Sequence, residues 1–305
     1  MSSDILDAAT PSGSDGPSDR EGRATARAQR TVLARALRNA SYEILPFKNT
    51  EESVLAHVPK DVALTVTTTE ARGLDRTLEL TERLSGHGYA TAPHLAARLV
   101  RDEAHLVDIV ARMREAGVDS VFVIGGDAPE AAGEFPDALS LLQRLDAVGH
   151  PFRTVGIGGY PEGHGTISDE LIEKALRDKA PHATQLVTQL CFDAGTILRW
   201  ARRVRADGVA TPIRVGIPGV VSRQKLVRIA AGLGLGPSAR FLAKQQNMLW
   251  RFFLPGGYNP KRLVEALAPQ LGGADHGIEG FHVFTFNELE KTEAWRRDRI
   301  ARLSS

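Results

Sequence analysis

One glutamate lies in a sequence context that suits proton transfer. Glu43 belongs to the run Ser41-Tyr42-Glu43-Ile44-Leu45, which is typical of a strand. Because side chains alternate along a strand, Tyr42 and Ile44 share one face and Glu43 points to the other. Inside a closed sheet, apolar surroundings would raise the pKa of this carboxyl and suit a general acid at neutral pH. On a surface strand, Glu43 would be an ordinary solvated carboxylate.

Two further polar side chains follow apolar runs where strands are predicted to end. Asp127 comes directly after Gly125 and Gly126, and glycines let the backbone approach a ligand closely. A carboxylate there can accept two parallel hydrogen bonds from an amidine-like edge. An aspartate that only ends a strand in a glycine turn fits the same pattern. Gln189 follows Thr188 at the end of another run, and its amide can donate and accept at once.

Histidines and the one cysteine complete the reactive side chains. His94 ends a third apolar run, and His164 follows a glycine-rich segment. Each histidine is either a structural hydrogen-bonding group or a catalytic one. Cys191 lies in an apolar segment and is expected to be a buried core thiol. No set of His, Cys and acidic residues has metal-ligand spacing, so the sequence predicts no metal site.

The elements that must position these side chains follow a regular rhythm of short apolar runs and longer amphipathic stretches. Strands are predicted at 41–45, 63–67, 90–94, 120–124, 153–157, 185–189, 213–217 and 280–284. Helices are predicted at 76–85, 103–116, 135–148, 169–179, 195–205, 223–233 and 288–303. Asp102, Ser168 and Asn287 are placed to cap three of these helices.

Eight strands that alternate with helices predict parallel pairing and closure into a (βα)8 TIM barrel, with a doubly wound open sheet as the alternative. Residues 1–21 are rich in Ser, Asp, Gly and Pro and are predicted to form a disordered tail. A helical extension is expected at 22–39. Residues 22–305 then form a single barrel domain, and the segment 237–271 is an insertion between the last two strands.

The composition restricts the partners and the compartment. The 305 residues carry a net charge of +1, which gives no electrostatic footprint for nucleic acid or a membrane surface. No apolar run approaches the roughly 20 residues of a membrane-spanning helix, and the N-terminus has no secretory signal. The single cysteine excludes an internal disulfide. We therefore expect a cytoplasmic protein without nucleic-acid or membrane partners.

Taken in order, these segments resemble the methylenetetrahydrofolate reductase family over about residues 41–295. The likeness rests on seven short motifs, each at a predicted strand end. They are Tyr42-Glu43-Ile44-Leu45-Pro46-Phe47-Lys48, Ala92-Pro93-His94-Leu95, Gly125-Gly126-Asp127, Gly159-Tyr160-Pro161-Glu162, Thr188-Gln189-Leu190-Cys191-Phe192-Asp193, Ile217-Pro218-Gly219-Val220-Val221 and His282-Val283-Phe284-Thr285-Phe286-Asn287. A single motif of this kind is weak, whereas seven in the right order are specific.

The resemblance implies an oxidoreductase of one-carbon metabolism that converts 5,10-methylenetetrahydrofolate to 5-methyltetrahydrofolate. Glu43 matches the acid that protonates the folate at N-10 and opens its five-membered ring to a 5-iminium cation. Asp127 matches the carboxylate that grips the pterin amino and N-3–H edge and stabilises that cation. Gln189 matches a pterin-binding amide. The folate is the expected partner.

The cofactor contacts of the family are matched only in part. Members normally carry FAD, but here Gly125 replaces an arginine, and Leu171 and Lys174 stand where Asp and Asn are expected. No tyrosine follows the second strand. The chain resembles the short, flavin-independent kind, in which NADH takes the flavin's place as hydride donor and FAD is absent. The expected cofactor-binding residues are Thr67, His94, Gly125, Gly126, Tyr160, His164 and Arg177.

Three other functions stay open. A FAD-dependent reductase with altered flavin contacts would use the same acid. A pterin-binding methyltransferase predicts no acid inside the first strand and no use for NADH. A folate-binding protein without activity would not need Glu43. NADH is favoured over NADPH because no basic pair offers a site for a 2′-phosphate. The sequence does not specify how many copies assemble.

Overall fold

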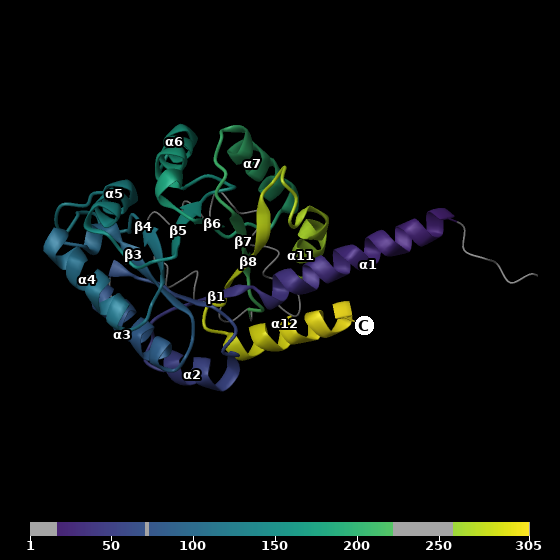
Figure 1. Cartoon of the computed structure of the whole chain (residues 1–305), viewed down its shortest axis with the longest axis horizontal. Coiled ribbons are helices and arrows are strands. Elements are labelled where there is room, and N and C mark those ends of the chain that lie inside the picture. Colours follow the sequence, from purple (N-terminus) through teal and green to yellow (C-terminus); the bar gives the residue numbers. More distant parts are fainter. Residues whose placement is uncertain (1–16, 71–72, 222–258, 305) are drawn as a thin grey trace, which may run out of the picture.

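The computed structural model describes residues 17–70, 73–221 and 259–304. Eight strands form a closed barrel in sequence order, and β8 pairs with β1. Every neighbouring pair is parallel. The helices lie around the outside of this barrel (Figure 1). The predicted (βα)8 TIM barrel is confirmed, and the open sheet is excluded.

The strand bounds agree closely with the alternation of apolar residues. The strands are β1 (Ser41–Ile44), β2 (Leu64–Val66), β3 (Thr91–Ala96), β4 (Ser120–Ile124), β5 (Thr154–Gly159), β6 (Gln185–Thr188), β7 (Ile213–Pro218) and β8 (Ile278–Phe284). β3 continues two residues beyond His94, to Ala96. His94 therefore lies inside a strand, and not at its end as predicted.

The described helices surround the barrel, with short 3₁₀ turns between some of them. They are α1 (Pro17–Arg38), α2 (Thr50–His57), α3 (Gly73–Gly86), α4 (Glu103–Glu115), α5 (Ala138–Val148), α6 (Asp169–Lys179), α7 (Ala194–Ala206), α11 (Lys261–Leu267) and α12 (Leu289–Ser304). The 3₁₀ turns are η2 (Ala97–Leu99), η3 (Ala180–His182) and η4 (Ala268–Gln270). None of these helices is long and apolar enough to cross a membrane.

Several helix predictions need correction. α1 begins at Pro17, so residues 17–21 are helical and do not belong to a tail; a proline suits a first helical turn because its missing N–H needs no partner there. α2 was not predicted because it is only two turns long and buries just Thr50 and Val54. α11 lies in the predicted insertion. Residues 1–16, the predicted helix 223–233 and most of 237–271 lie outside the described residues.

Two of the three predicted caps are confirmed. The Asp102 carboxylate accepts a hydrogen bond from the His105 backbone N–H at 2.8 Å, and the Ser168 hydroxyl accepts one from the Leu171 backbone N–H at 3.4 Å. The third prediction was wrong. The Asn287 side chain bonds instead to the backbone of Leu45, the residue that follows β1.

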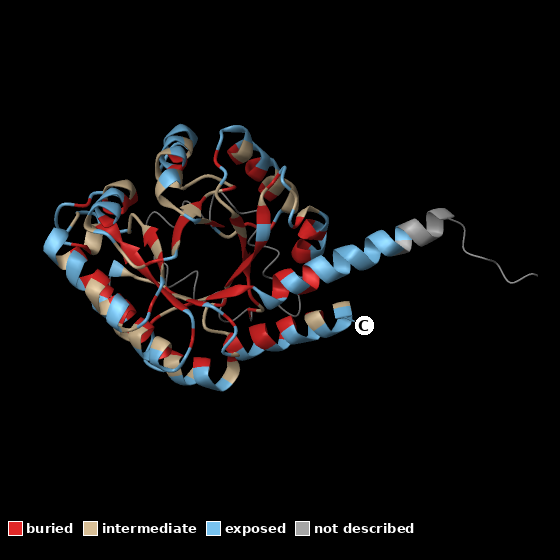
Figure 2. Ribbon diagram, in the orientation of Figure 1, coloured by how far each residue is buried: buried red, intermediate tan, exposed pale blue. Residues whose placement is uncertain are grey.

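The core lies between the barrel and its helices (Figure 2). Strand residues that point outward are apolar and fully buried, as Tyr42, Ile44 and Ile157 are. Inside the barrel, large side chains lie over glycines of the next strand. A Cβ added at Gly156 would come within 2.4 Å of the Phe122 ring. This leaves the polar inward side chains near the carboxyl ends of the strands as candidates for chemistry.

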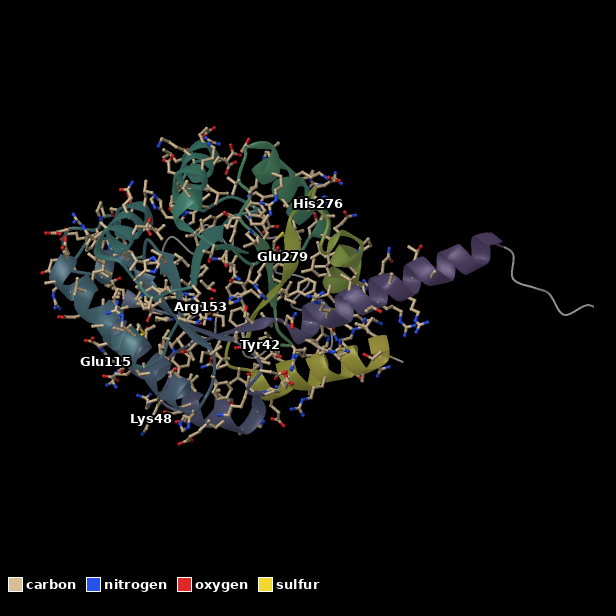
Figure 3. The ribbon with its side chains drawn as sticks, in the orientation of Figure 1. Tyr42, Lys48, Glu115, Arg153, His276 and Glu279 are labelled. Atoms are coloured by element: carbon tan, nitrogen blue, oxygen red, sulfur yellow. The ribbon has the colours of Figure 1, made fainter. Side chains whose placement is uncertain are left out.

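α1 and α12 lie side by side, α1 also contacts β8, and the first part of α1 projects away from the barrel (Figure 1). The Tyr42 hydroxyl, near the centre of Figure 3, donates to Glu293 of α12 at 2.8 Å. Arg296 donates two hydrogen bonds to the same carboxylate, at 2.8 and 3.0 Å, and others to the carbonyls of Leu37 and Arg38. One buried ion pair thus joins both terminal helices to the strand that carries Glu43.

Candidate active site

Glu43 points into the barrel, as alternation predicted. Its neighbours Tyr42 and Ile44 are buried on the opposite face, and the Glu43 side chain is only 18% exposed. The Glu43 Oε2 atom lies 3.9 Å from Nε2 of His94 and 3.7 Å from Nε2 of His282. The surface-strand alternative for Glu43 is therefore excluded. These distances exceed hydrogen-bond range, so each imidazole lies beside the carboxyl without a direct bond.

His94 is a neutral imidazole at physiological pH. Burial lowers the pKa of His94 to about 4, with His282 acting in the same direction and the charge of Glu43 opposing it. The ring packs against Phe122 with centroids 4.6 Å apart, and the backbone carbonyl accepts a hydrogen bond from Thr68. Its Nε2 has no hydrogen-bond partner in the described part of the chain. His94 and Glu43 therefore form no ion pair, although their side chains lie close together.

His282 is a site residue that the sequence did not single out. The parallel register places it beside Ser41, and the two side chains share a hydrogen bond of 2.8 Å at His282 Nδ1. This bond turns the other ring nitrogen toward Glu43. The ring packs edge-on against Phe284 at 5.2 Å. Its position on the inward face of the last strand indicates a site residue only when the pairing of β8 with β1 is known.

The loops after β4 and β5 bring Asp127 and Tyr160 near each other. Asp127 is exposed, whereas burial and the negative charge of Asp127 together raise the pKa of the Tyr160 hydroxyl. The Tyr160 ring packs edge-on against His164 at 5.5 Å. Gly126 has a φ of 91°, a left-handed conformation that favours glycine. The glycine before Asp127 therefore sets the direction in which the loop leaves β4.

Gln189 and Thr67 also follow strand ends. Gln189 is exposed, and its backbone N–H donates to the Gly159 carbonyl at 2.7 Å. Its side-chain oxygen accepts from the Leu190 N–H at 2.9 Å, so the amide nitrogen is the end that faces away from this bond. The Thr67 N–H donates to Ile44 at the end of β1, and its Oγ1 is buried with no partner among residues 17–70, 73–221 and 259–304.

This arrangement can be compared with known proteins. The methylenetetrahydrofolate reductase family model matches residues 40–237, which is more than half of the chain. The chain belongs to this family. The matched region holds β1 to β7 and thus Glu43, His94, Asp127 and Gln189.

Individual members of the family are distant relatives. A 5,10-methylenetetrahydrofolate reductase of Pectobacterium carotovorum is 27% identical over 84% of this chain and 88% of its own length. A probable methylenetetrahydrofolate reductase (NADH) of Oryza sativa is 27% identical over 47% of this chain and 27% of its own length. A probable methylenetetrahydrofolate reductase (NADPH) of Caenorhabditis elegans is 29% identical over 37% of this chain and 18% of its own length. The eukaryotic relatives are matched over 18–27% of their own lengths.

The positions on α6 where the reductase family is expected to contact its flavin have other roles here. Leu171 is 59% exposed. Lys174 forms an ion pair with Asp178 on the same helix. Arg177 lies in the last turn of α6 and pairs with Asp207, after α7, at 3.5 Å. Arg177 is thus held by the residue that follows α7.

Cys191 is a buried thiol, as predicted. Burial and the charge of Glu162 raise the pKa of Cys191 to about 12, so the thiolate nucleophile is not formed at neutral pH. Within the described ranges, no three His, Cys, Asp or Glu side chains are grouped so as to hold a metal ion.

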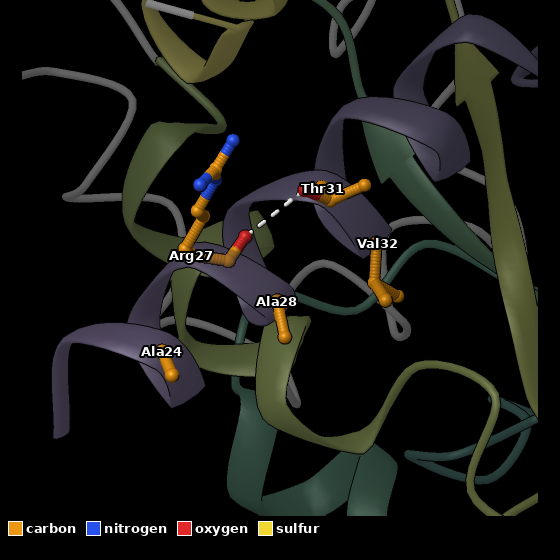
Figure 4. Close-up of a pocket in the computed structure, with 5 residues that line it drawn as sticks. All are labelled: Ala24, Arg27, Ala28, Thr31 and Val32. Atoms are coloured by element: carbon orange, nitrogen blue, oxygen red, sulfur yellow. Dashed lines mark hydrogen bonds between the residues drawn. The ribbon is translucent and has the colours of Figure 1, made fainter. Parts of the chain in front are cut away.

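A shallow pocket on α1 lies outside the barrel (Figure 4). It is lined by Ala24, Arg27, Ala28, Thr31 and Val32, and the Thr31 hydroxyl donates to the Arg27 carbonyl. The lining contains one guanidinium and no carboxyl or imidazole group, so it offers no general acid that works near neutral pH. The barrel interior around Glu43 remains the candidate active site of this reductase family member.

Proposed function

We propose that this protein reduces 5,10-methylenetetrahydrofolate to 5-methyltetrahydrofolate with a hydride taken directly from NADH. The observation that carries this proposal is the position of Glu43, a carboxyl inside the barrel between two imidazoles in a member of the reductase family. A pterin-binding methyltransferase is expected to have no acid inside the first strand. The match to the Pectobacterium enzyme over most of both chains supports the same activity.

Glu43 would act as the general acid. Its proton passes to N-10 of the folate, the bond between N-10 and the methylene carbon breaks, and a 5-iminium cation forms. NADH supplies the hydride that reduces this carbon. His94 is neutral, so it places no positive charge beside Glu43. After turnover the Glu43 carboxylate takes a proton back from solvent.

Asp127 and Gln189 would hold the pterin ring. Both side chains are exposed after strand ends that meet at the same mouth of the barrel, so a ligand can reach them. The Asp127 carboxylate can accept two hydrogen bonds from the pterin amino and N-3–H edge, and its charge would stabilise the iminium cation. The amide nitrogen of Gln189 is free of the bond to Leu190 and could donate to the ring.

The proposal of a nicotinamide nucleotide in place of a flavin is supported by the side chains at the expected flavin contacts. Gly125 offers no side chain, Leu171 is exposed, and Lys174 and Arg177 are engaged in ion pairs. We therefore propose that FAD is absent. The proposed NADH contacts are Thr67, His94, Gly125, Gly126, Tyr160 and His164. Arg177 is omitted from these proposed contacts because its guanidinium pairs with Asp207. Relatives are named for NADH and for NADPH, so the preference for NADH rests on the missing basic pair.

The cofactor proposal is tested on the purified protein. We expect no flavin bands in its visible spectrum, and NADH oxidation that depends on methylenetetrahydrofolate without added flavin. NADPH, assayed in parallel, should be the poorer donor. Stoichiometric FAD in an acid extract, together with loss of activity when the FAD is removed, would contradict the proposal and favour the FAD-dependent alternative.

A further inference from the structure

The turn after β8 has an unusual backbone. Phe286 and Asn287 have φ values of 49° and 59°, and they are the only residues other than glycine with positive φ among those described. The Glu288 N–H donates to the Thr285 carbonyl at 2.9 Å, which closes a four-residue turn around them. Turns with two central left-handed residues usually contain Gly, Asn or Asp. Asn287 fits this preference, and a phenylalanine beside it does not.

The side chain of Asn287 bonds to the end of β1. Its Oδ1 accepts a hydrogen bond from the Leu45 N–H at 2.9 Å, and its Nδ2 donates to the Leu45 carbonyl at 3.0 Å. The amide thus makes the same pair of bonds that a neighbouring strand would make. Nδ2 also donates to the Thr50 hydroxyl at 2.8 Å, and Thr50 donates to the Leu45 carbonyl. Leu45 is therefore held although β1 has already ended at Ile44.

The same turn holds the backbone of Glu43. The Thr285 hydroxyl donates to the Glu43 carbonyl at 2.5 Å and accepts the Asn287 N–H at 3.1 Å. Consecutive bonds from one turn thus fix the backbone at Glu43 and at Leu45, two residues further on. The Glu43 carboxyl has no direct hydrogen bond to His94 or His282 at 3.9 and 3.7 Å. Its direction therefore depends strongly on the backbone that carries it.

From these contacts we propose that Asn287 is a positioning residue for Glu43. By extending the β1–β8 pairing with its side chain, it keeps the acid aimed at the folate nitrogen. The left-handed turn is the conformation that brings the Asn287 amide to Leu45. This inference rests on the proposed role of Glu43 as general acid. Asn287 itself touches no reacting atom.

Asn287→Gly is the sharpest test because glycine accepts the left-handed φ and only the side-chain bonds are lost. We expect kcat to fall about ten- to a hundredfold, since small misplacement of a catalytic group has effects of that order. The folate and NADH dissociation constants should stay near their original values. Asn287→Asp keeps the acceptor for the Leu45 N–H but loses the donor to the Leu45 carbonyl. Its kcat should therefore lie between that of the unmodified protein and that of Asn287→Gly.

Thr184→Ala is the matched control. It removes a comparable side-chain bond, from the Val155 N–H at 2.9 Å, at the opposite end of the barrel. We expect its melting temperature to fall, by less than that of Asn287→Gly because one bond is lost and not three, while kcat is retained. An equal loss of kcat in both variants would overturn the positioning role.

The decisive comparison repeats Asn287→Gly in a Glu43→Gln background. If Asn287 acts through Glu43, it should change the residual turnover less than about twofold, because coupled residues are not additive. Equal losses in both backgrounds would indicate a merely structural role and overturn the inference. Unchanged kcat in Asn287→Gly beside a reduced kcat in Glu43→Gln would overturn only the inference. Full turnover in Glu43→Gln would overturn the proposed function as well.

Discussion

At the scale of single residues, the neutral state of His94 links the site to the stability of the fold. The imidazole is fully buried beside Glu43 and His282, and its pKa is lowered from 6.5 to about 4. A buried imidazole of this kind costs stability when the solution becomes acidic, because the unfolded chain can take up a proton that the folded protein refuses. The neutral His94 beside Glu43 therefore makes the folded protein less stable at low pH.

The pH dependence of unfolding tests this state of His94. Between pH 6.5 and 4 the unfolded chain binds a proton at this position and the folded protein does not, so the free energy of unfolding falls as the pH drops. A pKa that falls from 6.5 to about 4 is worth at most roughly 3.5 kcal/mol, since one pKa unit corresponds to about 1.4 kcal/mol. His94→Asn should flatten the slope of unfolding free energy against pH, measured by urea titration. His57→Asn, on the outer helix α2, is the control.

The slope is the readout, because removing a buried ring also lowers stability at every pH. A slope that is the same in His94→Asn and in the unmodified protein would show that His94 is not held neutral in the folded state.

At the scale of elements, β1 is fixed from both of its faces. Its inward side carries Glu43, and its outward Tyr42 hydroxyl donates to Glu293 on α12. Burial pushes the pKa of Glu293 up, but hydrogen bonds from Arg296 and Tyr42 outweigh it, so the pKa is lowered and the carboxylate is charged. Glu293 and Arg296 are 3% and 5% exposed. The terminal helix α12 is therefore docked through a buried, paired charge directly behind the strand of the acid.

Glu293→Ala should be strongly destabilising because it leaves the Arg296 guanidinium buried without its carboxylate. Breaking a buried pair in this way costs about 3–5 kcal/mol. Asp298→Ala is the matched control on the same helix, since it removes an exposed pair with Arg302, which is worth about 0–1 kcal/mol. Chemical denaturation of both variants measures the difference. A similar, small loss in both would show that the buried pair does not hold α12 in place.

At the scale of the whole molecule, eight parallel strands bring side chains from distant parts of the sequence to one mouth. Glu43 and His282 are 239 residues apart in the chain, yet their side chains approach to 3.7 Å because β8 returns to β1. The closed barrel, the strand positions and the inward direction of Glu43 could be predicted from the sequence. Each of these depends on local periodicity, which a single chain displays directly.

The remaining features depend on pairing that local patterns do not reveal. Asn287 looks like a helix cap because it precedes Glu288, but its amide bonds to Leu45, 242 residues away. His282 begins one of the seven motifs, but its place beside Glu43 follows only from the pairing of β8 with β1. The end of β3 was placed two residues early, where Pro93 and His94 interrupt the apolar run. Long-range register is thus the part of the site that the sequence leaves undetermined.

The most direct test of the account is the kinetics of Glu43→Gln together with binding titrations. The change keeps the shape of the side chain and removes its transferable proton. As a control, Asp127→Ala should weaken folate binding more than about tenfold and leave NADH binding nearly intact, because one charge-assisted hydrogen bond is worth about 1.5–3 kcal/mol. For Glu43→Gln we predict a turnover lower by about 10²–10⁴-fold, with folate and NADH still bound, because the loss falls on the transition state. A turnover within about threefold of that of the unmodified protein would be a far smaller loss than that expected for a general acid. It would mean that the proton comes from another group and would contradict the assignment of Glu43.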